Sequence, residues 1–207
     1  MKNKLLAAVL ILSSVGAYAQ VTVAAKAHAL FPAGKPTWES VKAGAVEAYE
    51  AEGKNNVGFN AGLSVKVNLV GGLFVMPEIY YTTFTNEITG PLPDNTTIEA
   101  KTNRADLPVL LGYNVLGESV GIFAGPVASY NLSKDNQYED FRENAESNFT
   151  VGFQLGAQVK IKSFIISGRY EGSFTEDQRD FINSNTNTVI RYDNRPSMLM
   201  AGLGYQF

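Results

Sequence analysis

Apolar residues recur at every second position along most of this chain, which is the side-chain period of a β-strand and not of a helix. The segment 149–161 alternates without a break, with apolar side chains at odd positions and Thr, Gly, Gln or Lys at even ones. The segment 57–69 repeats the pattern. Weaker alternation covers 21–31, 73–85, 98–115, 119–132, 164–174 and 187–207. The sequence therefore predicts eight strands.

The connections between these segments alternate in length. Tight turns fall at 71–72, 116–118 and 162–163, whereas the connections at about 32–56, 86–96, 133–147 and 175–186 are long and polar. Short periplasmic turns and long extracellular loops are typical of outer-membrane barrels. We therefore expect an all-β fold, an eight-stranded antiparallel up-and-down transmembrane β-barrel of the outer-membrane type.

A soluble eight-stranded barrel would show the same alternation. The residue types on the two faces therefore have to distinguish a soluble barrel from a membrane barrel. One face is nearly all aliphatic and aromatic, and the other carries Gly, Ser, Asn, Gln, Thr and a few charges, as a lipid-facing wall around a small polar interior requires. Aromatic residues also gather at both strand ends, as two interfacial girdles would. They are Phe31, Phe59, Tyr81, Tyr130, Phe149, Tyr170 and Phe174 toward the loops, and Tyr113, Phe164, Tyr205 and Phe207 toward the turns.

Proline counts against a closed barrel, because it removes a donor from the strand ladder. Four prolines lie inside predicted strands, namely Pro77, Pro108, Pro126 and Pro196. Around the last of them the parity changes, since Ile190 and Tyr192 alternate out of step with Leu199 and Leu203. We expect a bulge at 194–196 that brings both sets to the lipid face.

The first long loop carries a second pattern. Trp38, Val41, Ala45 and Tyr49 stand at helical spacing, and Gly53 follows as a C-cap. A short helix over the barrel mouth and a mobile surface loop both fit these residues, because an isolated helix of this length is marginal in water.

The chain begins with the features of an export signal. Lys2 and Lys4 precede an apolar run from Leu5 to Leu12, and Ala17-Tyr18-Ala19 forms a cleavage site of the small-x-small type. The run is far shorter than the roughly 20 residues that a spanning helix needs. We expect residues 1–19 to be a cleaved signal peptide and residues 20–207 to form one outer-membrane barrel domain.

Composition narrows the functions. The 207 residues are 45% hydrophobic and 18% charged, which suits one sizeable domain. The absence of cysteine removes disulfides, thiolate metal sites and Cys nucleophiles. With 17 Lys and Arg against 20 Asp and Glu, the net charge of −3 offers no basic excess for phosphates, so we expect no nucleic-acid partner.

Charged residues on the inward face are the candidate chemistry of the lumen. They are Lys26, Lys66, Glu78, Arg104, Asp106, Lys160, Arg169 and Glu171, with His28 beside them. An eight-stranded barrel is only wide enough for its side chains to fill, and buried charges need partners. We therefore interpret them as an interior salt-bridge network, in which Arg169 and Glu171 face Lys160, Glu78 or Arg104; a selective pore or an acid-base site is the alternative.

No catalytic, cofactor-binding or metal-binding residue is predicted. His28 lacks a Ser or Asp constellation of recognisable spacing and a second His, so we assign it a structural role. The third and fourth loops are acidic, which indicates a solvated outer surface, or a loose divalent bridge to surface glycolipid. Their acidic residues are Asp135, Glu139, Asp140, Glu143, Glu146, Glu176, Asp177 and Asp180.

Several short motifs resemble the PorT-like outer-membrane β-barrel family of Bacteroidota. They are the segments 107–113 (LPVLLGY), 125–130 (GPVASY), 151–157 (VGFQLGA), 168–170 (GRY) and 202–207 (GLGYQF). The resemblance covers the predicted barrel domain and implies an architecture and a location. It supplies no catalytic motif, and some members of that family belong to the type IX secretion and gliding apparatus.

These observations favour a non-enzymatic integral protein of the outer membrane of a Gram-negative bacterium, with a structural or surface-interaction role and no cofactor. An accessory role in a secretion or gliding complex and a small pore are the alternatives. Expected partners are outer-membrane lipids and glycolipid, envelope proteins, and the barrel-assembly machinery. The last of these follows from the final strand, which places Leu199, Ala201, Leu203, Tyr205 and Phe207 on one face.

Overall fold

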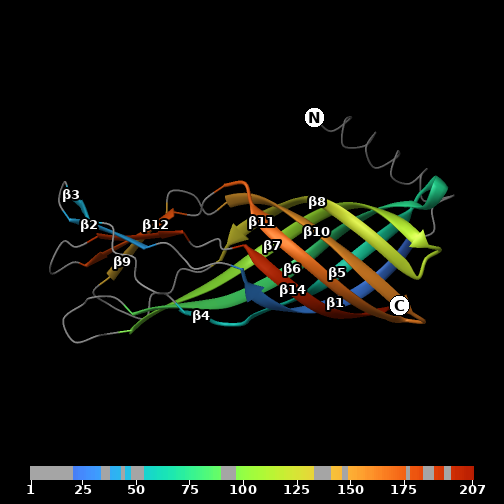
Figure 1. Ribbon diagram of the computed structural model, residues 1–207, viewed down its shortest axis with the longest axis horizontal. Helices are drawn as coiled ribbons and strands as arrows, with labels where there is room; N and C mark the ends of the chain where they lie inside the picture. The colour runs from blue at the N-terminus through green and yellow to red at the C-terminus, as the bar shows by residue number, and fades with distance from the viewer. Residues whose placement is uncertain are drawn as a thin grey trace, which may run out of the picture.

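The protein forms a closed barrel that is elongated along its axis (Figure 1). The computed structural model describes residues 21–33, 38–42, 45–47, 54–89, 97–132, 141–145, 149–175, 178–183, 189–193 and 197–207. Among these residues, no helix is long and apolar enough to cross a membrane.

Eight antiparallel strands make the barrel wall, as the alternation predicts. They are β1 (Val21–Pro32), β5 (Gly58–Asn68), β6 (Leu73–Thr89), β7 (Thr97–Leu116), β8 (Val120–Asn131), β10 (Phe149–Ile161), β11 (Phe164–Ser173) and β14 (Met198–Gln206). Around the wall the order is β6-β5-β1-β14-β11-β10-β8-β7, and β7 pairs with β6 to close the sheet. The first strand and the last are neighbours, with Ala24 opposite Gln206. The predicted all-β up-and-down fold is confirmed.

Three tight turns close one end of the barrel, at the predicted positions. A short 3-10 helix, η1 (Val70–Gly72), joins β5 to β6, and its glycines Gly71 and Gly72 have φ angles of 75° and 85°. Gly117 and Lys162, in the other two turns, also have positive φ, at 54° and 57°. This turn end is the periplasmic end of an outer-membrane barrel. Strand β14 finishes there, at the right of Figure 1.

Burial alternates along the strands with a period of two residues. In β10, Thr150, Gln154 and Gln158 are buried, whereas Leu155 and Val159 are exposed on the outer wall. The predicted girdle aromatics are also exposed, with the exception of Tyr170, which is half-buried. An exterior of exposed aliphatic and aromatic side chains around a polar interior matches a wall that faces lipid.

The long connections are more ordered than the sequence indicates. Strands β6 and β7 continue to Thr89 and from Thr97, and β4 (Lys54–Asn55) pairs with β6. Five further strands build a second sheet, of order β3-β2-β13-β12-β9. They are β2 (Trp38–Lys42), β3 (Ala45–Glu47), β9 (Phe141–Ala145), β12 (Gln178–Asn183) and β13 (Val189–Asp193). The sequence describes these connections only as long and polar, and their strands lie beyond the loop end of the barrel (Figure 1).

Two expectations about the loop strands are corrected. The segments 38–42 and 45–47 pair with each other as strands, with Val41 opposite Val46, and so do not form the helix that the spacing allowed. The eighth predicted strand, 187–207, divides into β13 and β14, which belong to different sheets. Ile190 therefore pairs within the second sheet, opposite Ser40, and not on the barrel wall. The bulge expected at 194–196, with Pro196, falls outside the described residues.

The prolines interrupt the ladder without opening the barrel. Pairing of β6 with β7 reaches Pro77 opposite Val109, omits two residues on each strand beside Pro108, and resumes at Tyr80 opposite Asp106 in the same register. Pairing of β7 with β8 has a similar gap beside Pro126 and also keeps its register. Each proline thus costs local ladder bonds, and the neighbouring pairs hold the strands in place.

Candidate functional site

The inward charges meet in the middle of the barrel, as the sequence predicts. Six of them are buried together with His28, namely Lys26, Glu78, Arg104, Asp106, Arg169 and Glu171. Lys66 and Lys160 are only partly buried and lie toward the turn end. The candidate site of this protein is therefore the filled lumen.

Glu78 is the centre of the first cluster. Its Oε1 accepts hydrogen bonds from Lys26 Nζ at 2.9 Å and from Arg169 Nη2 at 3.0 Å, and its Oε2 accepts from Arg169 Nη1. The paired guanidinium and carboxylate face each other in two parallel bonds, which is the strongest geometry for such a pair. Two cations share one carboxylate, so this cluster carries a net positive charge.

Arg104 is the centre of the second cluster. Its Nη2 donates to Glu171 Oε1 at 2.6 Å, and its Nε lies 2.9 Å from Asp106 Oδ1. The hydroxyl of Thr82 donates to Asp106 Oδ2 at 2.6 Å. One cation here serves two carboxylates, so the second cluster carries the opposite net charge to the first.

Gln154 joins the two clusters. Its Nε2 donates to Glu171 Oε2 at 2.8 Å, and its Oε1 accepts from Arg169 Nη1 at 3.3 Å. The predicted network is confirmed for Arg169 with Glu78 and for Glu171 with Arg104. The third predicted partner is wrong, because Lys160 instead pairs with Glu118 at 3.1 Å. Lys160 stands at the turn end of β10, where the turn after β7 presents a carboxylate.

His28 sits between two polar side chains that the sequence did not link to it. Its Nδ1 is 2.7 Å from Asn60 Oδ1 and its Nε2 is 3.2 Å from Ser167 Oγ. An amide oxygen only accepts, so Nδ1 donates to Asn60; in the neutral ring, Nε2 then accepts from the Ser167 hydroxyl. Their strands, β5 and β11, lie on either side of the β1–β14 pair, so only the closed wall brings them together.

The contacts of Ser167, His28 and Asn60 follow the order of a Ser-His-Asn triad, but their surroundings do not suit catalysis. All three residues are buried, with 6%, 1% and 2% of their surfaces exposed. The edge of the imidazole packs on Tyr80, with ring centroids 5.3 Å apart. A nucleophile needs a space beside it that a substrate can reach, and Ser167 is buried in the lumen. The assignment of His28 as a structural residue therefore stays our interpretation.

Apolar side chains occupy the rest of the interior. One buried cluster lies toward the loop end and another toward the turn end. Their members are Leu30, Phe84, Met198 and Met200 in the first, and Phe74, Met76, Leu110 and Phe123 in the second. The polar network thus lies between two apolar clusters, and the described part of the lumen is a packed core.

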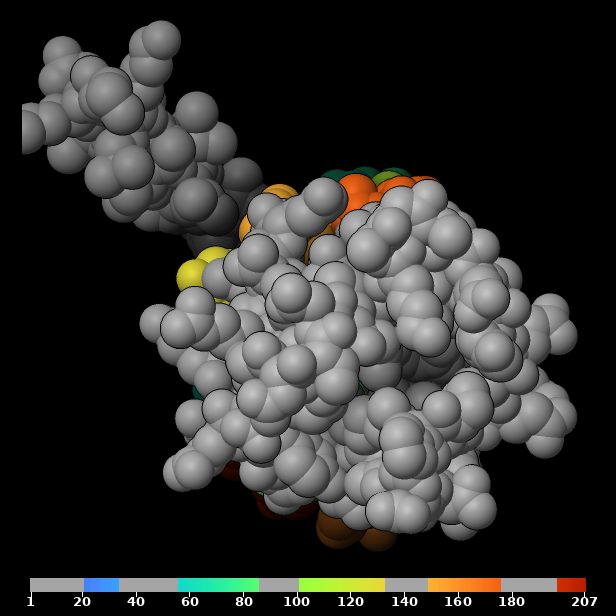
Figure 2. Space-filling model, turned by 90° about the vertical axis from the view of Figure 1, so that its left-hand side faces the viewer, coloured from blue at the N-terminus to red at the C-terminus, as the bar shows by residue number. Residues whose placement is uncertain are grey.

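Two further expectations from the sequence concern metal sites and the acidic loops. Within the described ranges, no three His, Asp or Glu side chains group as a metal site. The acidic side chains of the third and fourth loops lie outside the described side chains. Figure 2 looks at the molecule from the loop end. The described barrel strands are visible there only at the margins of the molecule.

Comparison with known proteins identifies the family. The model of the outer membrane protein beta-barrel domain matches residues 38–176, which is more than half of the chain. The chain belongs to this family. It is an integral barrel protein of the outer membrane, and the matched residues include six of the eight wall strands, from β5 to β11. No curated protein matches the chain.

Solved structures show the same fold at low sequence identity. The outer membrane protein OprG from Pseudomonas aeruginosa is 14% identical, with a TM-score of 0.65 over 90% of this chain and 95% of that one. The outer membrane protein AlkL, solved in lipid bilayers, is 13% identical, with a TM-score of 0.59 over 92% of each chain. Ail of Yersinia pestis, in a nanodisc, is 15% identical, with a TM-score of 0.50 over 91% and 100%. At this identity the likeness shows the barrel fold.

Proposed function

We propose that the protein has a non-catalytic structural or surface-interaction role, and that it is not a conduit. The observation that carries the proposal is the filled lumen. Two ionic clusters joined through Gln154 span the interior, and apolar clusters pack on either side. Since both ionic clusters are completed by side chains from opposite parts of the wall, a solute would have to break buried pairs to pass.

The loop end supports the surface-contact part of the proposal. The second sheet takes β2 and β3 from the first long connection, β9 from the third, and β12 and β13 from the fourth. Three separate loops are therefore joined by backbone pairing into one unit on the side that faces outward. Its edge strands are β3 and β9, and edge strands are the usual place where another protein adds a strand.

The test compares three strains: the parent, a deletion strain, and a strain whose protein carries short Gly-Ser turns in place of 38–47, 137–147 and 178–193. We expect the second and third strains to lose the same surface property, measured as cell attachment and cell–cell aggregation. The set of exported proteins, measured by mass spectrometry, stays as in the parent. A heat-modifiable gel band verifies that the shortened barrel still folds.

Selective loss of exported cargo in the deletion strain would contradict this proposal. It would favour an accessory role in a secretion or gliding complex, which the resemblance to PorT-like proteins of Bacteroidota suggests. Discrete ion conductance by the purified barrel would instead favour a small pore.

We also propose the route by which the chain reaches the membrane. Residues 1–19 direct export and are removed after Ala19, and the last strand is recognised by the barrel-assembly machinery. In the folded barrel Tyr205 and Phe207 are exposed at the turn end, with ring centroids 5.9 Å apart. N-terminal sequencing of the membrane-embedded protein tests the cleavage, with Gln20 expected as the first residue. Replacing Phe207 with Ser tests assembly, and we expect less protein in the outer membrane.

A further inference from the structure

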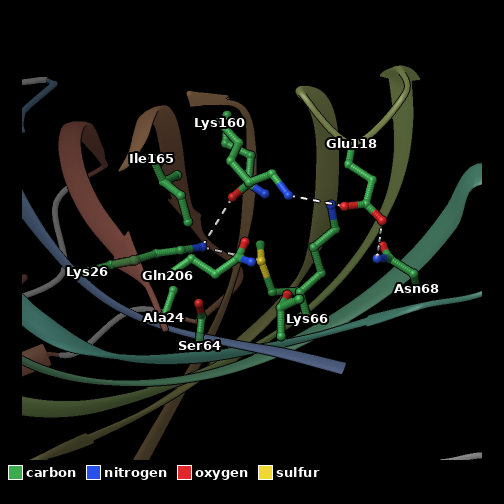
Figure 3. A pocket seen from close by; sticks show the side chains of 12 residues that line it. Ala24, Lys26, Ser64, Lys66, Asn68, Glu118, Lys160, Ile165 and Gln206 are labelled. Atoms are coloured by element: carbon green, nitrogen blue, oxygen red, sulfur yellow. Dashed lines mark hydrogen bonds and ion pairs between the residues drawn. The ribbon is translucent and has the colours of Figure 1, made fainter. Parts of the chain in front are cut away.

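A small pocket with a cavity volume of about 20 Å³, partly open to solvent, lies at the turn end of the barrel. Three lysines line it, Lys26 from β1, Lys66 from β5 and Lys160 from β10. Figure 3 shows Lys66 and Lys160 extending toward Glu118, while Lys26, from the strand beside that of Lys66, lies on the far side of the pocket from Glu118. Polar groups of Thr22, Ser64, Asn68, Gln158 and Gln206 complete the lining.

Glu118 is the only carboxylate among the lining residues. It lies on the tight turn after β7, where Gly117 has a φ of 54°. Its Oε2 accepts from Lys160 Nζ at 3.1 Å and its Oε1 accepts from Asn68 Nδ2 at 3.2 Å. The two carboxylate oxygens are thus held by donors from two different strands. The side chain is 42% exposed, so it can leave the pocket without unfolding the turn.

Lys66 has no carboxylate of its own within the part of the chain that the structure describes. Its Nζ donates to Asn114 Oδ1 at 2.7 Å and lies 4.2 Å from the centroid of Phe74. Asn114 Nδ2 in turn is 3.4 Å from Asn68 Oδ1, which orients the Asn68 amide so that its Nδ2 meets Glu118. Neutral partners hold the ammonium in place, and Glu118, the carboxylate that acts on its charge, is bonded to Lys160.

The balance of charge in the pocket is therefore positive. Lys66 and Lys160 face one carboxylate, Glu118. The third lysine does not reduce the excess, because its partner Glu78 is shared with Arg169. A cleft lined by one sign of charge between low-dielectric walls concentrates the opposite ion.

We propose that this pocket binds a single carboxylate group of a periplasmic molecule, and that Glu118 occupies part of the site when no such molecule is bound. The donors in the pocket favour a carboxylate ligand, because Lys160 and Asn68 already donate to the two oxygens of the Glu118 carboxylate. Its size admits one end group and not a folded partner. The open side faces the periplasm, so the ligand is a soluble or cell-wall molecule of that compartment that carries a free carboxylate.

The test uses the full barrel, without its signal peptide, in lipid nanodiscs at constant ionic strength. Acetate is the first probe and inorganic phosphate the second, and the signals followed are the backbone amide shifts of residues 64–68 and 117–119. We expect saturable shifts with acetate. Replacing Glu118 with Gln removes the competing carboxylate and lowers the Kd for acetate about fivefold, the change that one partly exposed ion pair gives.

Lysine variants provide the matched controls. Lys66→Met and Lys160→Met are expected to abolish saturation, whereas Lys162→Met, which changes an exposed lysine in the neighbouring turn, leaves it unchanged. A heat-modifiable gel band establishes that each variant is folded, and Glu118→Gln tests the site by a gain of binding. Equal titrations for the Lys66 and Lys162 variants, or no gain from Glu118→Gln, would overturn the site. Saturation by phosphate but not by acetate would overturn the carboxylate assignment.

Discussion

Arg169 and Glu78 form a buried ion pair between strands that lie on opposite sides of the barrel. Four steps around the wall separate β11 from β6 in either direction, so the pair spans the full width of the lumen. Both side chains are fully buried. This pair fills the lumen and also sets the distance between the two walls. It does so because it links β6 and β11, which share no backbone hydrogen bonds.

Replacing Arg169 with Met is expected to destabilise the barrel by about 1–3 kcal/mol, because Glu78 Oε2 is left buried without its donor while Lys26 still compensates the charge. The measurement is urea unfolding of the refolded protein in lipid, followed by the circular dichroism of the β-sheet and by gel mobility. The double variant Arg169→Met/Glu78→Gln should be less stable still, because it leaves Lys26 buried without a carboxylate. Equal stability of the single and double variants would contradict the sharing of Glu78 by the two cations.

A methyl group added at Gly202 is expected to damage the interior. Gly202 lies opposite His28 on the neighbouring strand, and a Cβ there would overlap the imidazole ring. Gly202→Ala should therefore cost about 1–3 kcal/mol, as overpacking of a filled core does. Gly168→Ala is the matched control, since a Cβ at Gly168 meets no atom within 4 Å. Equal unfolding midpoints for the two variants would show that the His28 ring moves without cost.

The barrel wall could be predicted from the sequence because each strand carries its own evidence. The parity of one strand, such as 149–161, separates the lipid face from the lumen, and eight such strands with alternating short and long connections leave one closed topology. The inward charges follow from the same parity. Which charges meet across the lumen depends on the stagger of strands that are not neighbours. Lys160 was assigned to the wrong partner for a different reason, because the register of the neighbouring strands β10 and β11 places it opposite Ile165, away from Arg169 and Glu171.

The second sheet and the surroundings of His28 could not be read from the sequence. The strands at 38–42 and 141–145 are short and polar, and each pairs with a segment from another loop. Ser167 and Asn60 are 139 and 32 residues from His28 in sequence, without any motif spacing. The one available signal was the alternation of inward and outward positions along each strand. It places all three side chains inside the barrel but does not give their positions along the barrel axis.

Ser167 is expected to be unreactive toward a fluorophosphonate probe in the folded barrel. Its hydroxyl has the hydrogen bond to His28 that activates a nucleophile, yet the residue is 6% exposed and is packed in the lumen. Labelling is measured by mass spectrometry of the refolded protein, with a known serine hydrolase as the positive control. Stoichiometric labelling that is lost in Ser167→Ala and in His28→Ala would contradict the structural role and revive an enzymatic one.

The filled lumen predicts that the purified barrel shows no discrete current steps in a planar lipid bilayer. Arg104 and Arg169 are the two guanidinium groups that reach across the interior, and Arg104 also stands 5.7 Å from the ring centroid of Phe84. The triple variant Arg104→Ala/Arg169→Ala/Phe84→Ala should open a path for ions. It should prefer cations, because four carboxylates, Glu78, Asp106, Glu118 and Glu171, then outnumber three lysines, Lys26, Lys66 and Lys160. Lys162→Ala serves as the silent control, and heat-modifiable mobility verifies folding. Discrete steps in the unaltered protein, or an anion-selective current in the triple variant, would contradict this description of the lumen.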